Sequence, residues 1–232
     1  MKLFRRIFPM VCVAAAICDA GETVLVEQKF ENEEGLNHWH TSQKPIFKDP
    51  KYQFSIQEED GVKFLHTSNP LHLGTLLQPA VKVDDSVLRL EVVVEMRNAK
   101  GANPLSFSVS DEPHYFENPF RKGARDSGFY IQGYQYGNQY NFLKWRKNGE
   151  EIFCRPSVEP LNFLPPAMEH RWVTWKLVYN HAEKQLEFWR GDEPNPFLVQ
   201  HGVDLSGITL KRLFLKCGSS DYRSAKAILV TK

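Results

Sequence analysis

Apolar and polar residues alternate in short runs along this 232-residue chain, a pattern typical of half-buried β-strands and not of helices. In the segment 87–97 (VLRLEVVVEMR), apolar side chains from Leu88 to Met96 share one side, while Arg89 and Glu91 fall on the other. Similar runs predict strands at 23–28, 52–57, 62–66, 73–78, 104–110, 128–136, 140–146, 172–179, 185–190, 210–216 and 226–231.

Turn residues separate these runs. Asp60-Gly61, Asn148-Gly149 and Gly191-Asp192 are dipeptides that favour tight turns. Two stretches, 111–127 and 161–170, lack a clean period, and we expect long loops there. Many short strands with no helical stretch between them predict an all-β fold, an antiparallel β-sandwich or barrel.

The first twenty residues differ from the rest. Lys2, Arg5 and Arg6 precede an apolar run at 7–17 and small residues that end at Ala20, which is the layout of a secretory signal peptide. The run is too short to cross a bilayer, which takes roughly 20 residues. We therefore predict a signal peptide at 1–20 and one domain at 21–232, with a mature protein that is secreted or periplasmic and has no membrane anchor.

Charge and cysteine content narrow the possible partners. Residues 1–20 hold three of the 29 basic groups and one of the 28 acidic groups, so their removal leaves a net charge of about −1. A surface without basic excess is a poor nucleic-acid binder, so we expect no nucleic-acid partner. Cys154 and Cys217 remain after cleavage and could form a disulfide or stay as two free thiols.

Several local patterns occur in a familiar order. Phe30-Glu31-Asn32 leads to Leu36–Trp39, an Asp60-Gly61-Val62 hairpin precedes the long strand at 87–97, and the segment 172–177 (WVTWKL) is followed by 186–189 (LEFW). This order resembles the concanavalin A-like lectin and glucanase superfamily, which includes laminin G-like modules. The resemblance implies a jelly-roll β-sandwich whose concave sheet carries the ligand groove.

Candidate binding residues lie on the strands at 128–136 and 140–146. Sugar rings present apolar C–H faces bordered by hydroxyls, and aromatic rings beside hydrogen-bonding groups suit both features. One side of the first strand is aromatic and polar, and we expect it to face open space between loops. The predicted carbohydrate-binding residues are Tyr130, Gln132, Tyr134, Tyr136, Trp145, Arg146 and Arg125. The alternative is that the tyrosines pack beneath a loop.

No strong catalytic or metal-binding pattern is present. The weak catalytic candidates are His114, Asp126 and Tyr130, and the chain lacks the Glu-x-Asp-x-x-Glu strand of the superfamily's retaining glucanases. His38 and His40 have no third ligand at a suitable spacing, so we predict no metal site. Nothing indicates a cofactor, and a calcium site built from scattered loop oxygens would leave no pattern to find.

Three functions are compatible with these features. The first is an exported carbohydrate-recognition or glycan-processing accessory domain that binds an oligo- or polysaccharide on the concave sheet. The second is a glycoside hydrolase or polysaccharide lyase that uses the loop at 111–126. The third is a protein-binding module of the laminin G-like kind.

Overall fold

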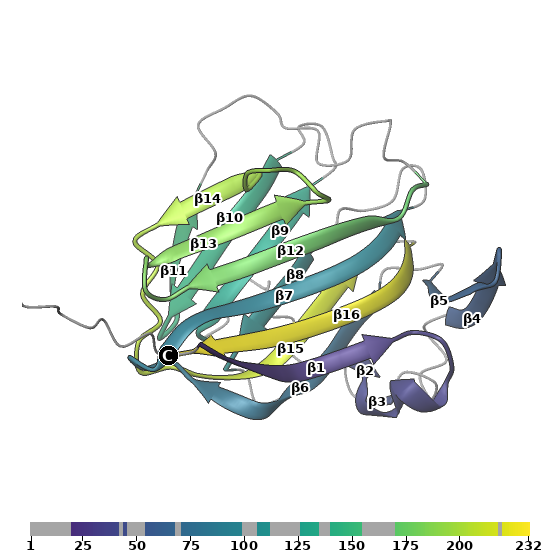
Figure 1. Ribbon diagram of the computed structural model, residues 1–232, viewed down its shortest axis with the longest axis horizontal. Coiled ribbons are helices and arrows are strands. Elements are labelled where there is room, and N and C mark those ends of the chain that lie inside the picture. The colour runs from purple at the N-terminus through teal and green to yellow at the C-terminus, as the bar shows by residue number, and fades with distance from the viewer. Residues whose placement is uncertain are drawn as a thin grey trace, which may run out of the picture.

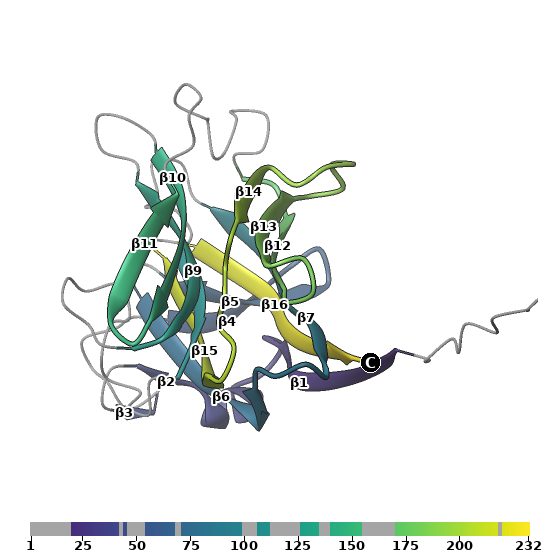
Figure 2. The ribbon, with the colours of Figure 1, turned by 90° about the vertical axis from the view of Figure 1, so that its left-hand side faces the viewer.

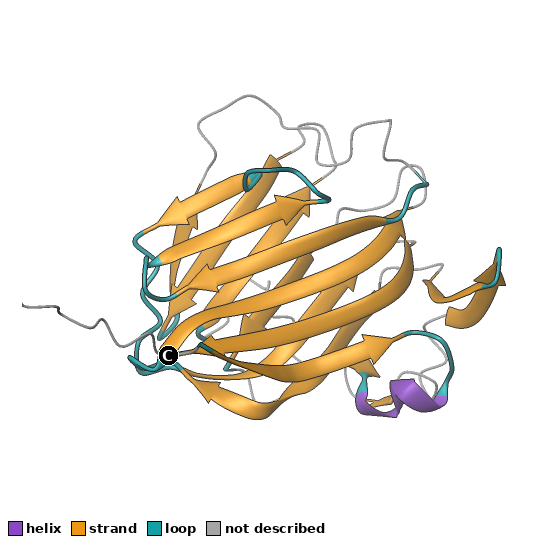
Figure 3. Ribbon diagram, in the orientation of Figure 1, coloured by secondary structure: helices purple, strands orange, loops and turns teal. Residues whose placement is uncertain are grey.

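The computed structural model describes residues 20–41, 44–45, 54–67, 71–98, 106–111, 126–134, 140–154, 170–217 and 220–232. These residues form two antiparallel sheets and one short 3-10 helix, η1 (Glu34–His38). Figures 1 and 3 show sheet A in front, and Figure 2 shows the two layers from the side. The predicted all-β sandwich is confirmed.

Sheet A has the strand order β14-β13-β12-β7-β16-β5-β4, and β1 also pairs with β16. Its strands are β1 (Gly21–Lys29), β4 (Phe54–Glu59), β5 (Val62–Thr67), β7 (Val87–Asn98), β12 (Val173–Asn180), β13 (Gln185–Arg190), β14 (Leu198–His201) and β16 (Ser220–Thr231).

Sheet B has the order β11-β10-β9-β8-β15-β6-β2-β3. Its strands are β2 (His40–Thr41), β3 (Lys44–Pro45), β6 (Leu71–Lys82), β8 (Ser106–Ser110), β9 (Gly128–Tyr134), β10 (Tyr140–Lys147), β11 (Glu150–Cys154) and β15 (Thr209–Cys217). The last two strands of the chain therefore lie inside the sheets, β15 between β8 and β6, and β16 beside β7.

The predicted turns form as the sequence indicates. Asp60 and Gly61 between β4 and β5 both have positive φ (52° and 75°), and so do Asn148 and Gly149 between β10 and β11 (53° and 84°). Two consecutive positive φ values match the type I′ turn, whose twist suits a two-residue hairpin. These dipeptides set the register of their hairpins.

The core lies between the two sheets and contains the apolar side of each alternating strand. Leu90, Val92 and Val94 of β7 are fully buried, as is Phe107 of β8. Trp175 stacks on Phe188 with ring centroids 5.4 Å apart, and Phe188 also meets Phe107 at 5.9 Å. Aromatic contacts of this kind add to the free energy gained from burial.

The strand order separates the two cysteines. Cys154 ends β11, Cys217 ends β15, and three strands of sheet B lie between β11 and β15. At about 4.8 Å per strand the two Cα atoms are roughly 19 Å apart, whereas a disulfide needs less than about 7 Å. Of the two alternatives for this pair, the backbone therefore disfavours the disulfide.

Two absences hold for the part of the chain that the structure describes. No helix there is long and apolar enough to span a bilayer. No group of three or more His, Cys, Asp or Glu residues there is arranged to hold a metal ion.

Candidate functional site

The candidate site is the sheet B outer face, meaning the side of β8, β9, β10 and β15 that points away from the core. Phe129 and Ile131 of β9 belong to the core, and successive side chains of a strand point to opposite sides. Tyr130 therefore points outward, as the sequence predicts.

Strand register places outward side chains from separate strands in rows. Tyr130 lies opposite Lys144 on one side and Ser108 on the other. The same row continues through Phe214 of β15 and Gly74 of β6 to His40 of β2. Cross-strand neighbours lie about 5 Å apart, so residues far apart in sequence form one continuous line across six strands.

A second row runs beside the first. It contains Arg146, Gly128, Ser110, Arg212 and Leu76, from β10, β9, β8, β15 and β6. Gly128 has a φ of +154°, and a Cβ there would come within 2.1 Å of the Val109 carbonyl oxygen. Glycine is therefore required where β8 and β9 approach each other between the two arginines.

The central side chains of both rows are almost fully buried although they lie outside the core. Tyr130 is 3% exposed, Lys144 8%, Arg146 2% and Arg212 1%. The Lys144 ammonium lies 5.7 Å from the centroid of the Tyr130 ring, and the Arg146 guanidinium lies 5.9 Å from it. Both distances fall within the range of cation–π attraction, so Tyr130 holds two cations at the centre of the face.

Asp126 supplies negative charge at the end of this face. It accepts a hydrogen bond of 2.5 Å from Arg146 Nη1, and both side chains are nearly inaccessible to solvent. Burial raises the pKa of the Asp126 carboxyl, and the Arg146 cation opposes that rise. Close by, Asp111 accepts a hydrogen bond from the backbone N–H of Ser127.

His40 lies at the far end of the first row. Burial lowers the pKa of its imidazole, and the positive charges of Arg212 and His38 lower it further. The positive charge of Arg212 thus acts on His40, so β2 lies in the same electrostatic environment as the sheet B outer face.

Ser108 occupies the middle of the first row. It is 1% exposed, and its hydroxyl has no hydrogen-bond partner among the residues that the structure describes. Leaving a buried hydroxyl unsatisfied costs about 1–3 kcal/mol, and such groups in native proteins need an explanation.

The predicted site residues divide into three groups: those at the sheet B outer face, Trp145, and those outside the described residues or side chains. Tyr130 and Arg146 share the sheet B outer face, and Asp126 joins them through its ion pair. The expectation that Tyr130 faces open space is wrong, because its ring is 3% exposed. The third group lies outside the described residues or side chains: His114, Arg125, Gln132, Tyr134 and Tyr136.

Trp145 requires a separate correction. It pairs with Phe129 across β9 and β10 and belongs to the core, so it points away from Arg146 and the sheet B outer face. Neighbouring residues of one strand cannot share a side, so the alternation in the sequence already argued against grouping these two.

Sequence analysis missed four members of the face: Lys144, Ser108, Arg212 and Phe214. The alternation in 209–217 (TLKRLFLKC) does place Arg212 and Phe214 on one side of a strand. What it does not supply is the strand order that brings β15 next to β8.

The sheet A outer face has a different character. Glu91 pairs with Arg89 at 2.6 Å and Glu95 with Arg223 at 2.7 Å, and all four side chains retain some exposure. The two glutamates are thus held by arginines on a partly solvated surface.

Structural comparison identifies the type of sandwich. A Bacillus subtilis protein of unknown function with a galectin-like fold aligns over 92% of this chain and 99% of its own, with a TM-score of 0.53 and 9% identity. The potassium-bound carbohydrate recognition domain of Emp46p aligns over 88% and 95%, with a TM-score of 0.54 and 11% identity. The fold is concanavalin A-like.

A third similar structure is the CBM2 module of the evolved Dit protein of Lactobacillus casei BL23 phage J-1. It covers 92% of this chain and 98% of its own, with a TM-score of 0.54 and 6% identity. No protein-family model and no curated protein matches the sequence. At these identities the likeness concerns the concanavalin A-like fold and not the residues of a site.

Proposed function

We propose that this protein is an exported carbohydrate-binding protein and that an oligo- or polysaccharide contacts its sheet B outer face. The observation that carries the proposal is the buried Ser108 hydroxyl, which lacks a described partner between the aromatic rings of Tyr130 and Phe214. The names of two similar structures, a carbohydrate recognition domain and a CBM2 module, support the same ligand class.

The chemistry of the face suits a sugar. Tyr130 and Phe214 are 3% and 2% exposed, and they would present aromatic surface to the C–H faces of a sugar ring once this face becomes accessible. Lys144, Arg146 and Arg212 carry N–H donors and no acceptors, which suits the many acceptor oxygens of a glycan. Ser108 can both donate and accept, so a sugar hydroxyl could satisfy it.

The burial of these side chains limits when a ligand can reach them. Removing a cation from water costs several kcal/mol, which other interactions must offset. The Asp126 carboxylate does so for Arg146, and the Tyr130 ring contributes for Lys144. Since Tyr130 is 3% exposed, a ligand reaches its ring only when this face becomes accessible. Binding should therefore change the solvent exposure of the site.

Export is part of the same proposal. The basic residues, apolar run and small residues within 1–20 support a signal peptide. A secreted or periplasmic location would bring the domain into contact with extracellular glycans.

The proposal is tested by glycan-array binding of the mature protein and two matched variants. Lys144→Met removes the cation beside Tyr130 and keeps the side-chain length. Lys147→Met makes the same change on the same strand, at a residue that instead pairs with Asp204 at 3.3 Å. We expect about a tenfold loss of glycan affinity for Lys144→Met and near wild-type affinity for Lys147→Met.

Two results would count against the proposal. One is the absence of binding to any glycan by the folded wild-type protein. The other is an equal effect of both methionine variants, because a general loss of positive charge would then explain it.

A further inference from the structure

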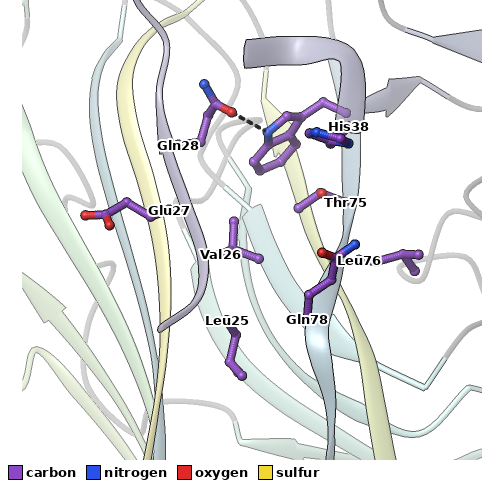
Figure 4. Close-up of a pocket in the computed structure, with 9 residues that line it drawn as sticks. Leu25, Val26, Glu27, Gln28, His38, Thr75, Leu76 and Gln78 are labelled. Carbon is purple, nitrogen blue, oxygen red and sulfur yellow. Dashed lines mark hydrogen bonds between the residues drawn. The ribbon is translucent and has the colours of Figure 1, made fainter. Parts of the chain in front are cut away.

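A pocket lies between the sheets at the edge where β1 and β6 run side by side, away from the sheet B outer face (Figure 4). Its volume is about 170 Å³. Pockets for drug-sized ligands have about 300–1,000 Å³, and a water molecule occupies about 30 Å³ of liquid. The pocket thus has room for one ring-sized polar molecule and not for an extended chain.

The two strands present neutral polar groups to this space. Gln28 of β1 and Thr75 and Gln78 of β6 line the pocket, and Figure 4 shows the Thr75 side chain directed from β6 towards β1. The Gln28 amide is already engaged, because its Nε2 donates to the Lys29 carbonyl at 2.6 Å and its Oε1 accepts from Trp39 at 3.3 Å. The Gln78 amide and the Thr75 hydroxyl can each donate and accept a hydrogen bond. Leu25 and Val26 add apolar surface, so the lining combines the two properties that a sugar ring requires.

The nearest carboxylate is turned away. Glu27 also borders the pocket, but Figure 4 shows its side chain on the other side of β1, and it pairs with Lys226 of β16 at 3.5 Å. Apart from that carboxylate and the imidazole of His38, which also borders the pocket, the polar groups on the described lining are neutral amides and a hydroxyl. This composition favours a neutral ligand over an acidic one.

Trp39 and Gln28 are held in place by contacts with each other and with their neighbours. Trp39 is 1% exposed, and its indole N–H donates to Gln28 Oε1 at 3.3 Å. Its ring meets Phe30 at 5.6 Å, which ties it to the core. Gly35 packs so closely on Gln28 that a Cβ there would lie 2.8 Å from the amide nitrogen. Side chains held in place lose little entropy on binding a ligand.

We propose that this pocket is a second, independent binding site, one that takes a single neutral monosaccharide unit. The ring would lie between Val26 and Trp39 on the apolar side and Gln28, Thr75 and Gln78 on the polar side. The site shares no residue with the two rows of the sheet B outer face apart from Leu76, whose side chain points away from the pocket in Figure 4.

The test is a titration of isotope-labelled mature protein with free glucose, galactose, mannose and N-acetylglucosamine, followed by NMR. At least one sugar should shift the indole N–H of Trp39 and the side-chain amides of Gln28 and Gln78. Glucuronic acid, which has a carboxylate where glucose has a hydroxymethyl group, should bind more weakly because no lysine or arginine is among the described residues that line the pocket.

Variants localise the binding. Gln78→Ala removes one donor and acceptor and should weaken sugar binding about tenfold. Gln57→Ala makes the same change at another exposed glutamine, on β4, and should leave binding unchanged. Thr75→Val keeps the volume of a residue that is 6% exposed and provides a second test if Gln78→Ala fails to fold.

The outcomes separate this pocket from the proposed glycan site. Lys144→Met should leave monosaccharide binding intact, whatever it does to glycan binding. The pocket proposal is overturned if none of the sugars shifts the three reporter groups, or if the shifts appear only around Tyr130 and persist in Gln78→Ala.

Discussion

The charged side chains on the outer faces of the two sheets differ in burial. On sheet A, Arg97 contacts Glu59 at 2.5 Å and Asp221 at 2.8 Å, and Asp221 also meets His66 at 2.7 Å. Burial lowers the pKa of Arg97, but these carboxylates outweigh burial, and the net pKa is raised. Each of these charged side chains thus has an oppositely charged partner and remains partly exposed to solvent.

Cations of both faces lie beside aromatic rings, since the Arg97 guanidinium is 4.9 Å from the centroid of Trp172, but the cations of sheet B are more deeply buried. Arg146 is 2% exposed, whereas the Arg97 side chain is 19% exposed. A partly solvated, neutralised face needs no further partner to be stable. A buried face with an unsatisfied hydroxyl is costly, and this difference is why we assign the ligand to sheet B.

The largest expected effect concerns the arginine of each face. Arg146→Met leaves the Asp126 carboxylate buried without its cation, which should cost about 3–5 kcal/mol of unfolding free energy. Arg97→Met leaves carboxylates that water can reach and should cost about 1 kcal/mol. Urea unfolding of both variants measures the two values, and equal losses would remove the distinction between the faces.

A smaller effect concerns the serines of β8. Ser108→Ala removes a buried hydroxyl without a described partner, so the variant should gain up to about 1 kcal/mol of stability while it binds glycans more weakly. Ser110→Ala, at an equally buried position of the same face, serves as the control. A Ser108→Ala protein that is both less stable and fully active in binding would show that the hydroxyl is structural.

The smallest expected effect is on the pH dependence of stability, which should have opposite signs for Asp204 and Asp126. The pKa of Asp204 is lowered to about 2, chiefly by the hydrogen bond from the Ser206 hydroxyl. Its native carboxylate binds a proton more weakly than the unfolded one, so its stabilisation is present above pH 3.8 and is lost as the pH falls towards 2. The pKa of Asp126 is raised by burial, so protonation of this carboxyl in acid should instead stabilise the native state.

Unfolding measured across this pH range with Asp204→Asn and Asp126→Asn tests both directions. The stability difference between the wild type and Asp204→Asn should shrink in acid. Relative to Asp126→Asn, the wild type should lose stability as the pH rises from 3.8 through the native pKa. A common sign for both differences would contradict the assigned environments.

Much of the fold could be predicted from the local alternation of apolar and polar residues and from the turn dipeptides. The run at 87–97 forms β7 (Val87–Asn98), and the Asp-Gly and Asn-Gly dipeptides turn where expected. Strands β11 and β14 were missed, because five- and four-residue edge strands are too short to show a clear period.

The candidate site was less predictable for a physical reason. Alternation shows that Tyr130 and Phe129 point to opposite sides, but it does not show which strand lies alongside. Ser108 and Phe214 join the row only through the order β9-β8-β15, which depends on contacts between distant segments. Burial of Tyr130 likewise depends on tertiary structure.

The position of β16 affects how the protein can be made. Thr231 pairs with Gly21, 210 residues earlier, and β16 also pairs along its length with β7. Until β16 has emerged from the ribosome, sheet A lacks a central strand, and sheet B lacks one until β15 has emerged. The nascent chain therefore leaves the edges of β7 and β8 uncovered until β15 and β16 have been made, which exposes it to aggregation and makes chaperone protection valuable.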